Sequence, residues 1–204
     1  MARLGMVFDL KACIGCSACV VACKQENSLP NGVFFTRILS YEYGNYPNVK
    51  RVYIPTICNQ CENPPCQKVC PSGATYTRAD GIVMVNGEKC IGCSSCVVAC
   101  PYDMRTLVEE ATLNAGLFGN GYITPFEAQG YGRHIPGAVI KCDFCSQRVD
   151  AGMHPACVAT CPTNARIFGD LDDPNSLPSV LIRKREGRQP LPEKNTKPKV
   201  YYVD

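Results

Sequence analysis

Hydrophobic positions along the chain form short runs between turn residues and give no long amphipathic repeat. The runs Gly5–Leu10 and Arg51–Pro55 have the length and apolar character of β-strands, and each leads into a group of cysteines. Val20–Ala22, between two cysteines, predicts the start of a short helix whose side chains are also core residues. Val33–Leu39 predicts a further strand within a turn-rich segment. The pattern favours a small α+β protein.

The second half alternates between one clear hairpin and long polar segments. Thr75–Val85 predicts a β-hairpin that turns near Asp80-Gly81, because Asp-Gly between apolar runs favours a tight turn. Residues 105–138 lack cysteines and are rich in glycine, but contain no nucleotide-binding glycine motif. They are predicted to form a surface loop, which at this length is typical of a functional segment that covers a partner.

The C-terminal segment from Asp170 is rich in proline and charge, which predicts a solvated tail. Val200–Val203 is apolar enough to return as an edge strand and anchor that tail. Basic residues are frequent here and offer a surface for a partner. They are Arg183, Lys184, Arg185, Arg188, Lys194, Lys197 and Lys199.

Charge and hydropathy exclude two classes of function. The net charge of +3 over 204 residues is too small to indicate nucleic-acid binding, and no basic helix is interleaved with aromatic residues. No apolar run approaches the roughly 18 residues of a membrane span. The N-terminus reaches Cys13 too early for a signal peptide, so we expect a soluble chain without an address of its own.

Sixteen cysteines carry the candidate chemistry, in four groups of four. The third group has the bacterial ferredoxin spacing Cys-x2-Cys-x2-Cys-x3-Cys-Pro, and the first matches it at ten of eleven positions, as an internal duplication would. The second and fourth groups have wider middle spacers but keep the ending x3-Cys-Pro. In chain order the groups are Cys13, Cys16, Cys19, Cys23; Cys58, Cys61, Cys66, Cys70; Cys90, Cys93, Cys96, Cys100; and Cys142, Cys145, Cys157, Cys161.

In ferredoxins with two clusters, the fourth cysteine of a run ligates the cluster of the other run. The second and third groups form one such pair. The first and fourth groups each lack a partner and are paired with one another. The prediction is four [4Fe–4S] clusters with iron bound by Cys13, Cys16, Cys19, Cys161; by Cys142, Cys145, Cys157, Cys23; by Cys58, Cys61, Cys66, Cys100; and by Cys90, Cys93, Cys96, Cys70.

This pairing predicts an α+β fold of two nested bacterial ferredoxin-like units with loop insertions and an extended C-terminal tail. The outer unit comprises residues 1–27 and 139–170, and the inner unit comprises residues 54–104. Residues 28–53 and 105–138 are insertions, and residues 171–204 are the tail.

Two other uses of the cysteines are less favourable. A disulfide scaffold is disfavoured because cysteines two or three residues apart would form strained or trivial loops. The eleven-residue spacer of the fourth group by itself resembles a zinc site, but zinc sites do not need cysteines exchanged between groups. Because every group already holds four cysteines, His134 and His154 are predicted to be surface or core residues.

The order of the groups, together with the stretches Cys-Asn-Gln-Cys-Glu-Asn-Pro-Pro-Cys and Ala-Cys-Pro-Tyr-Asp-Met-Arg, resembles the electron-transfer subunits of the molybdopterin oxidoreductases related to dimethyl-sulfoxide, polysulfide, thiosulfate and arsenate reductases. The resemblance spans residues 5–173 and is closest to the arsenate and polysulfide branches. Relatives with a tryptophan ligand do not apply, because this chain has no Trp.

The resemblance implies a non-catalytic subunit of an anaerobic respiratory reductase, in which no side chain is a catalytic acid, base or nucleophile. It would relay single electrons between a membrane-anchored, quinone-linked subunit and a large catalytic subunit holding Mo or W in a bis-molybdopterin guanine dinucleotide cofactor. The expected location is the periplasmic side of the membrane, after export with a leader-bearing partner, and otherwise the cytoplasm. A free-standing polyferredoxin is the alternative, which the long loops and tail disfavour.

Three lysines adjoin predicted ligands in sequence, namely Lys24, Lys89 and Lys141. If they face sulfur, their charge would stabilise the reduced cluster and raise its potential. The alternative interpretation is that they are ordinary solvated lysines.

Overall fold

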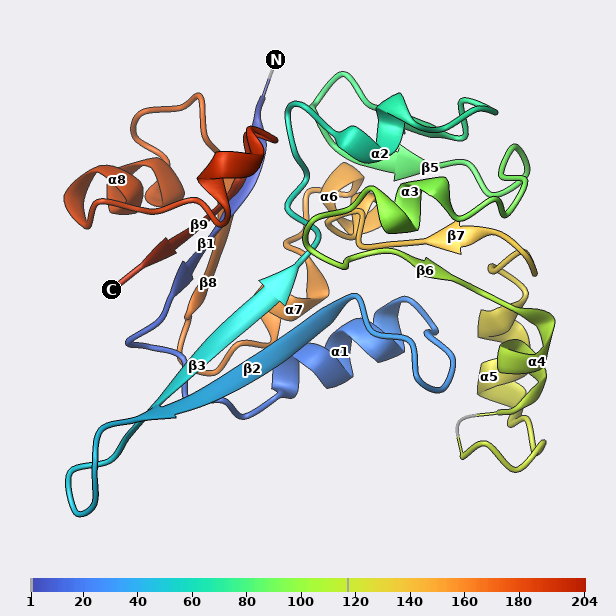
Figure 1. Ribbon diagram of the computed structural model, residues 1–204, viewed down its shortest axis with the longest axis horizontal. Coiled ribbons are helices and arrows are strands. Elements are labelled where there is room, and N and C mark those ends of the chain that lie inside the picture. Colours follow the sequence, from blue (N-terminus) through green and yellow to red (C-terminus); the bar gives the residue numbers. More distant parts are fainter. Residues whose placement is uncertain (1, 117) are drawn as a thin grey trace.

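The computed structural model describes residues 2–116 and 118–204 as a set of small sheets with short helices around them (Figure 1). The strands are β1 (Leu4–Asp9), β2 (Thr36–Tyr43), β3 (Lys50–Ile57), β4 (Thr75–Thr77), β5 (Val83–Val85), β6 (Thr106–Leu107), β7 (Val139–Ile140), β8 (Arg166–Asp170) and β9 (Val200–Val203). The helices are α1 (Ala18–Glu26), α2 (Pro65–Lys68), α3 (Ser95–Val98), α4 (Glu110–Asn114), α5 (Pro125–Tyr131), α6 (Ser146–Asp150), α7 (Ala156–Ala159), α8 (Leu177–Lys184) and the 3-10 turn η1 (Pro192–Lys194).

One three-stranded sheet, in the order β8-β1-β9, joins the two ends of the chain. β1 pairs antiparallel with β8 and parallel with β9, so the predicted N-terminal strand is confirmed as a central strand. Met6, Val7 and Phe8 are fully buried because both faces of β1 are covered. Its near-continuous apolar sequence is typical of such a strand.

A long antiparallel hairpin, β2–β3, fills the segment predicted to be an insertion with one strand. The predicted strand Arg51–Pro55 is confirmed within β3, and its partner β2 extends beyond the predicted Val33–Leu39 to Tyr43. The register runs from Thr36 opposite Ile57 to Tyr43 opposite Lys50. The hairpin projects well beyond the other elements (Figure 1).

Short elements flank the cysteine groups. The predicted hairpin Thr75–Val85 is confirmed as β4 paired with β5, and its turn is closed by the amide of Gly81, which donates to the carbonyl of Arg78 at 2.9 Å. The predicted helix after Cys19 is confirmed as α1, which is longer than the apolar run and ends at Glu26.

Residues 105–138 differ from the loop predicted for them, because they contain β6, α4 and α5. α5 begins with a capping box in which Thr124 and Glu127 exchange hydrogen bonds. Val108, Leu113 and Tyr131 pack together in a small apolar cluster. The segment therefore folds against the body of the protein through its own core.

The C-terminal segment is not the solvated tail that its composition predicted, although the strand within it is confirmed. α8 packs against β8 and β1, and β9 forms the edge of the sheet beside β1. Lys199 is only 1% exposed, and its ammonium group donates to the carbonyl of Gly81. Leu181 and Ile182 of α8 pack with buried residues of β1, β8 and β9, and most of the basic side chains of the segment stay exposed, so its many charges do not prevent this packing.

An ion pair connects the C-terminal segment to β1 of the sheet. Arg185 donates two hydrogen bonds to the carboxylate of Asp9, one of them at 2.9 Å, and this pairing lowers the pKa of Asp9 although burial opposes the shift. A carboxylate with a lowered pKa stabilises the folded state above its unfolded pKa of about 3.9, and this contribution is lost as the pH falls through the folded pKa.

We expect Arg185→Gln to destabilise the docking of β9 by about 0.5–1 kcal/mol at pH 7. Hydrogen–deuterium exchange of the β9 amides should then be about 2–5 times faster than in the wild type. Because the ion pair requires the Asp9 carboxylate, the difference in exchange rate between wild type and variant should persist at pH 5–7 and shrink below about pH 4. Equal exchange rates at pH 7 would contradict a stabilising pair.

No helix among the residues that the structure describes is long and apolar enough to cross a bilayer.

Candidate metal centre

The structure gathers the cysteines into four sets that draw on distant parts of the chain. Two sets surround narrow cavities: set 1 consists of Cys13, Cys16, Cys19 and Cys161, and set 4 consists of Cys70, Cys90, Cys93 and Cys96. All sixteen cysteines are free thiols. Within residues 2–116 and 118–204, no three Cys, His, Asp or Glu side chains converge at the spacing of ligands to a single metal ion.

The two other sets are identified by the mutual influence of their thiols. In set 3, burial raises the pKa of Cys61 to about 12, and the neighbouring Cys58, Cys66 and Cys100 add to the increase. In set 2, burial raises the pKa of Cys23, to which Cys157 and Cys145 contribute. Burial likewise raises the pKa of Cys142, the fourth member of set 2, with contributions from Cys23, from Cys58 of set 3 and from Cys157. Buried thiols of this kind are neutral until a metal binds and displaces their protons.

The sets form a row. Cys19 of set 1 packs in one buried core with Cys142 and Cys157 of set 2, and Cys58 of set 3 packs against that core. Set 3 meets set 4 in a small core that contains Cys66 and Cys96. All cysteines of set 2 are buried, whereas each end of the row has one exposed cysteine, Cys16 in set 1 and Cys93 in set 4.

Local hydrogen bonds orient several sulfur atoms, and two of them repeat in the duplicated sequence Cys-Pro-Ser/Thr. The Ser72 hydroxyl lies 3.7 Å from Cys70 Sγ, and the Thr163 hydroxyl lies 3.8 Å from Cys161 Sγ. A backbone amide, that of Thr75, also donates to Cys70 Sγ at 3.5 Å. Donors of this kind stabilise a negatively charged sulfur and hold it in place.

Arg105 lies between sets 3 and 4. It is 4% exposed, and its guanidinium donates to Cys66 Sγ and to the Thr75 hydroxyl, each at 3.0 Å. Among its neighbours are also Cys58 and Cys96. In the described part of the chain no carboxylate pairs with this buried cation, so its counter-charge has to come from the cysteines.

Arg166 has the same position relative to sets 1 and 2. It is 3% exposed, donates to the Thr36 hydroxyl at 2.8 Å, and stacks on the ring of Phe8 at 4.8 Å. Burial raises the pKa of both Cys19 and Cys157, and Arg166 offsets part of that increase.

The second terminal nitrogen of Arg166, Nη1, is buried without a hydrogen-bond partner among the described residues. A buried guanidinium N–H normally requires an acceptor. Sulfur atoms of an anionic cluster held by Cys19, Cys157 and their neighbours would supply one. The residues present therefore fit an iron–sulfur group with net negative charge in this position.

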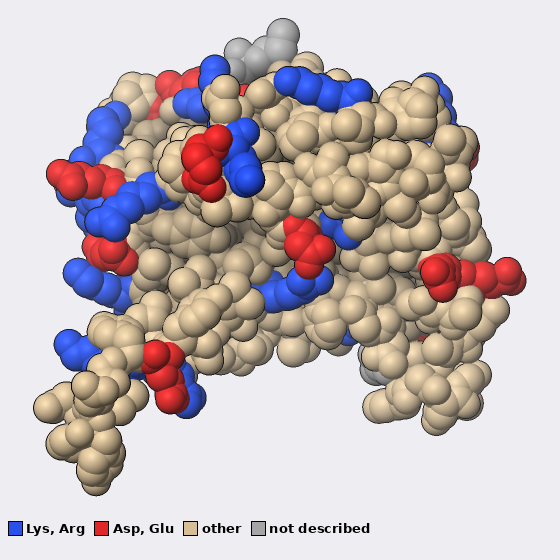
Figure 2. Space-filling view, in the orientation of Figure 1, with Lys and Arg blue, Asp and Glu red and all other residues tan. Residues whose placement is uncertain are grey.

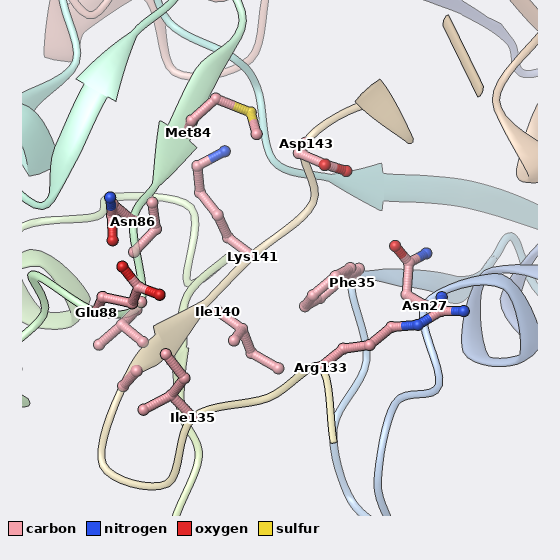
Figure 3. A pocket seen from close by; sticks show the side chains of 14 residues that line it. Asn27, Phe35, Met84, Asn86, Glu88, Arg133, Ile135, Ile140, Lys141 and Asp143 are labelled. Atoms are coloured by element: carbon pink, nitrogen blue, oxygen red, sulfur yellow. The ribbon is translucent and has the colours of Figure 1, made fainter. Parts of the chain in front are cut away.

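The three lysines next to cysteines have different environments. Lys24 donates to the carbonyls of Pro30 and Val33, and Lys89 is exposed. Lys141 is buried and donates to the carbonyls of Val83 and Cys142. Figure 3 shows its side chain extending toward Met84 at the edge of a cavity of about 480 Å³. None of these hydrogen bonds is to sulfur.

The two histidines have different environments. His134 Nε2 is 3.0 Å from the carbonyl oxygens of Asn27 and Ser28, and His154 is exposed. The residues that sequence reasoning missed are Arg105 and Arg166. A signal for them exists, because each arginine stands five residues after the cysteine of a Cys-Pro pair, Cys100 or Cys161.

The duplicated sequence Cys-Ile-Gly-Cys needs its glycine for two reasons. Gly15 has a φ of 70°, and a Cβ on it would lie 2.3 Å from the ring of Tyr53. Gly92 has a φ of 68°, and a Cβ there would lie 2.5 Å from the carbonyl oxygen of Gly137. Backbone in the left-handed region and close approach of a neighbour both exclude a side chain.

Gly15→Ala is expected to remove the metal group of set 1, because Tyr53 must shift together with the loop that carries Cys13 and Cys16. Iron per chain should fall by about four. Gly32→Ala is a matched control, because Gly32 has a similar φ of 75° but no atom within 4 Å of its added Cβ. Iron analysis that gives the same value for both variants would show that the contact with Tyr53 is unimportant.

Two family models of iron–sulfur domains match the chain. A family model described as a 4Fe-4S dicluster domain matches residues 49–115 and 124–171, and a second model with the same description matches residues 12–74. Together these matches include every cysteine group.

Relatives resemble the chain over nearly its whole length. It is 39% identical to the arsenate respiratory reductase iron-sulfur subunit ArrB of Shewanella sp. strain ANA-3, over 98% of this chain and 96% of that protein. It is 44% identical to a subunit of the selenate reductase of Mesobacillus selenatarsenatis, over 97% and 70%. It is 39% identical to a subunit of the tetrathionate reductase of Salmonella typhimurium, over 98% and 72%. The chain therefore belongs to the 4Fe-4S dicluster family and, within it, to the iron–sulfur electron-transfer subunits of the molybdopterin reductases.

Proposed function

We propose that the chain holds four [4Fe–4S] clusters, one in each cysteine set, as the relay of a respiratory reductase. Set 1 and set 2 would belong to an outer ferredoxin-like unit formed by residues 1–27 and 139–170. Set 3 and set 4 would belong to an inner unit formed by residues 54–104. When bound, the clusters supply one-electron transfer, and the protein supplies ligands, burial and fixed charge.

The observation that carries this proposal is the row of four sets, with a fully buried set 2 inside it and one exposed cysteine at each end. A relay needs neighbouring centres close together, because electron tunnelling weakens steeply with distance. It also needs two places where partners approach, and the exposed Cys16 and Cys93 mark these places. Exchange of the fourth cysteine between groups agrees with the two-cluster ferredoxin pattern.

The residues around the sets have two tasks. Arg105 and Arg166 provide positive charge in a low-dielectric interior, which favours the reduced and more negative state of a neighbouring cluster. Hydroxyl and amide donors at Cys70 and Cys161 hold individual sulfur atoms in place.

The catalytic partner is a large subunit with a molybdopterin cofactor that contains Mo or W. An integral-membrane, quinone-linked subunit would serve as the other partner, with the complex on the periplasmic side of the membrane. The family resemblance supports both assignments, and arsenate, polysulfide and thiosulfate are candidate terminal substrates of the catalytic partner.

The experiment is anaerobic iron and acid-labile sulfide analysis of the chain copurified with its partners, with Mo and W assayed in the same sample. We expect about sixteen iron and about sixteen sulfide per chain, and about one Mo or W per complex. Full iron without Mo or W in a stable monomer would favour a free-standing polyferredoxin. Zinc in place of iron would overturn the proposal.

A further inference from the structure

The β2–β3 hairpin, here called the arm, has an exposed outer part that the relay does not explain. Every residue from Leu39 to Arg51 is exposed. Side chains on alternate positions of the two strands share a face, and cross-strand partners lie on the same face. The arm therefore has two faces, which differ in what they contact.

One face is the wall of set 1. Ile38 and Pro55 are opposite one another in the register and both line the cavity that Cys13, Cys16 and Cys19 surround. The ring of Tyr53, on the same face, packs over Gly15. The base of the arm thus belongs to the end of the row where Cys16 is exposed.

The opposite face is mostly apolar and faces solvent, with Arg37 and Lys50 as its charged members. Leu39, Tyr41 and Tyr43 are 40%, 55% and 55% exposed, and they lie opposite Ile54, Val52 and Lys50. At the turn, Tyr46 is 93% exposed. Residues 43–49 contain no Asp, Glu, Lys or Arg, and Figure 2 shows the projecting tip without charged side chains.

Such an arm lacks the support that a hairpin usually needs. An isolated two-stranded hairpin is marginally stable in water, and a third strand or a packed surface is needed for independent stability. Exposed tyrosines on a rigid strand are typical anchors of protein–protein interfaces. A contiguous apolar face with aromatic anchors marks an interaction site.

We propose that the arm is a docking element for the catalytic subunit, which contacts the outer face and tip of the arm while it covers Cys16. This inference rests on the proposed function. Because the base of the arm is the wall of set 1, a protein that covers Cys16 lies next to the arm, whose outer face and tip project beside it. The catalytic subunit is the occupant, because the relatives are B subunits of reductases, which implies a catalytic subunit as partner.

The experiment compares two variants in the co-expressed complex. The triple variant Tyr41→Ser, Tyr43→Ser and Tyr46→Ser removes the aromatic anchors, and the control Tyr76→Ser with Tyr122→Ser removes exposed tyrosines outside the arm, which are 42% and 63% exposed. We expect the triple variant to bind the catalytic subunit at least about 30-fold more weakly, and the control to bind normally. Iron and sulfide per chain should be unchanged in both variants.

Three results would overturn the inference. In the first, the triple variant binds the catalytic subunit with unchanged affinity. In the second, the triple variant loses only a dimer of this chain. In the third, it loses only a membrane partner. If the triple variant loses iron, its weaker binding could reflect a damaged fold, and the single variant Tyr46→Ser then tests the inference. Tyr46 is 93% exposed and makes no contribution to the core. The single variant should weaken binding about 10-fold with full iron. A wild-type chain that lacks iron would instead contradict the proposed function.

Discussion

Replacing Cys58 and Cys61 by alanine is expected to free the thiol of Cys100 and to leave Cys70 protected. In the structure Cys100 adjoins Cys58, Cys61 and Cys66, whereas Cys70 lines the cavity of set 4. If each set holds one cluster, loss of two ligands empties set 3, and iron should fall by about four per chain. Anaerobic thiol alkylation followed by peptide mass spectrometry measures which cysteine reacts.

The reciprocal variant provides the control. Replacing Cys90 and Cys93 by alanine empties set 4 and should expose Cys70 to alkylation, with Cys100 now protected. If instead each group ligated its own cluster, the first variant would free Cys70 and the second would free Cys100. The two pairings thus predict that different cysteine peptides are alkylated in each variant. The result does not depend on activity of the complex.

Much of the candidate site follows from cysteine spacing, because a short loop with residues two or three apart restricts where a sulfur atom points. The duplicated sequence beginning at Cys13 and at Cys90 has left-handed residues at the same positions in both copies, Gly15 and Ser17 in one and Gly92 and Ser94 in the other, and a helix follows each serine. Local geometry of this kind is set by local sequence. The predicted exchange of cysteines links set 1 with set 2 and set 3 with set 4, but it does not link set 2 with set 3, so the order of the whole row depends on distant packing.

The parts that sequence reasoning missed depend on distant contacts. Arg105 donates a hydrogen bond to Cys66, which is 39 residues away in the sequence. Because charged side chains are usually solvated, the sequence around an arginine does not predict that it is buried. Likewise, the tail folds because Val200 packs beside Met6, at the other end of the chain. Within the glycine-rich segment, however, the sequence Thr-Pro-Phe-Glu at Thr124 is a recognisable helix start.

Replacing Arg105 or Arg166 by methionine is expected to lower the reduction potential of the adjacent cluster by roughly 100 mV. Methionine keeps much of the side-chain volume but removes a buried positive charge that favours the reduced state. A unit charge at about 5 Å and an effective dielectric constant of about 20 is worth roughly 3 kcal/mol. For one electron this corresponds to roughly 140 mV, which serves as an upper limit. Potentiometric titration followed by electron paramagnetic resonance measures the shift.

A surface arginine separates this effect from a general change of charge. Arg37 is 41% exposed and pairs with Asp103, so Arg37→Met should move no potential by more than about 20 mV. Arg105→Lys should recover part of the loss, because the ammonium keeps the charge but cannot bond both Cys66 and Thr75 in the same geometry. Since a guanidinium stays protonated, the shift should be the same at pH 6 and pH 9. If Arg105→Met and Arg37→Met gave equal shifts, the buried arginine would have a structural role alone.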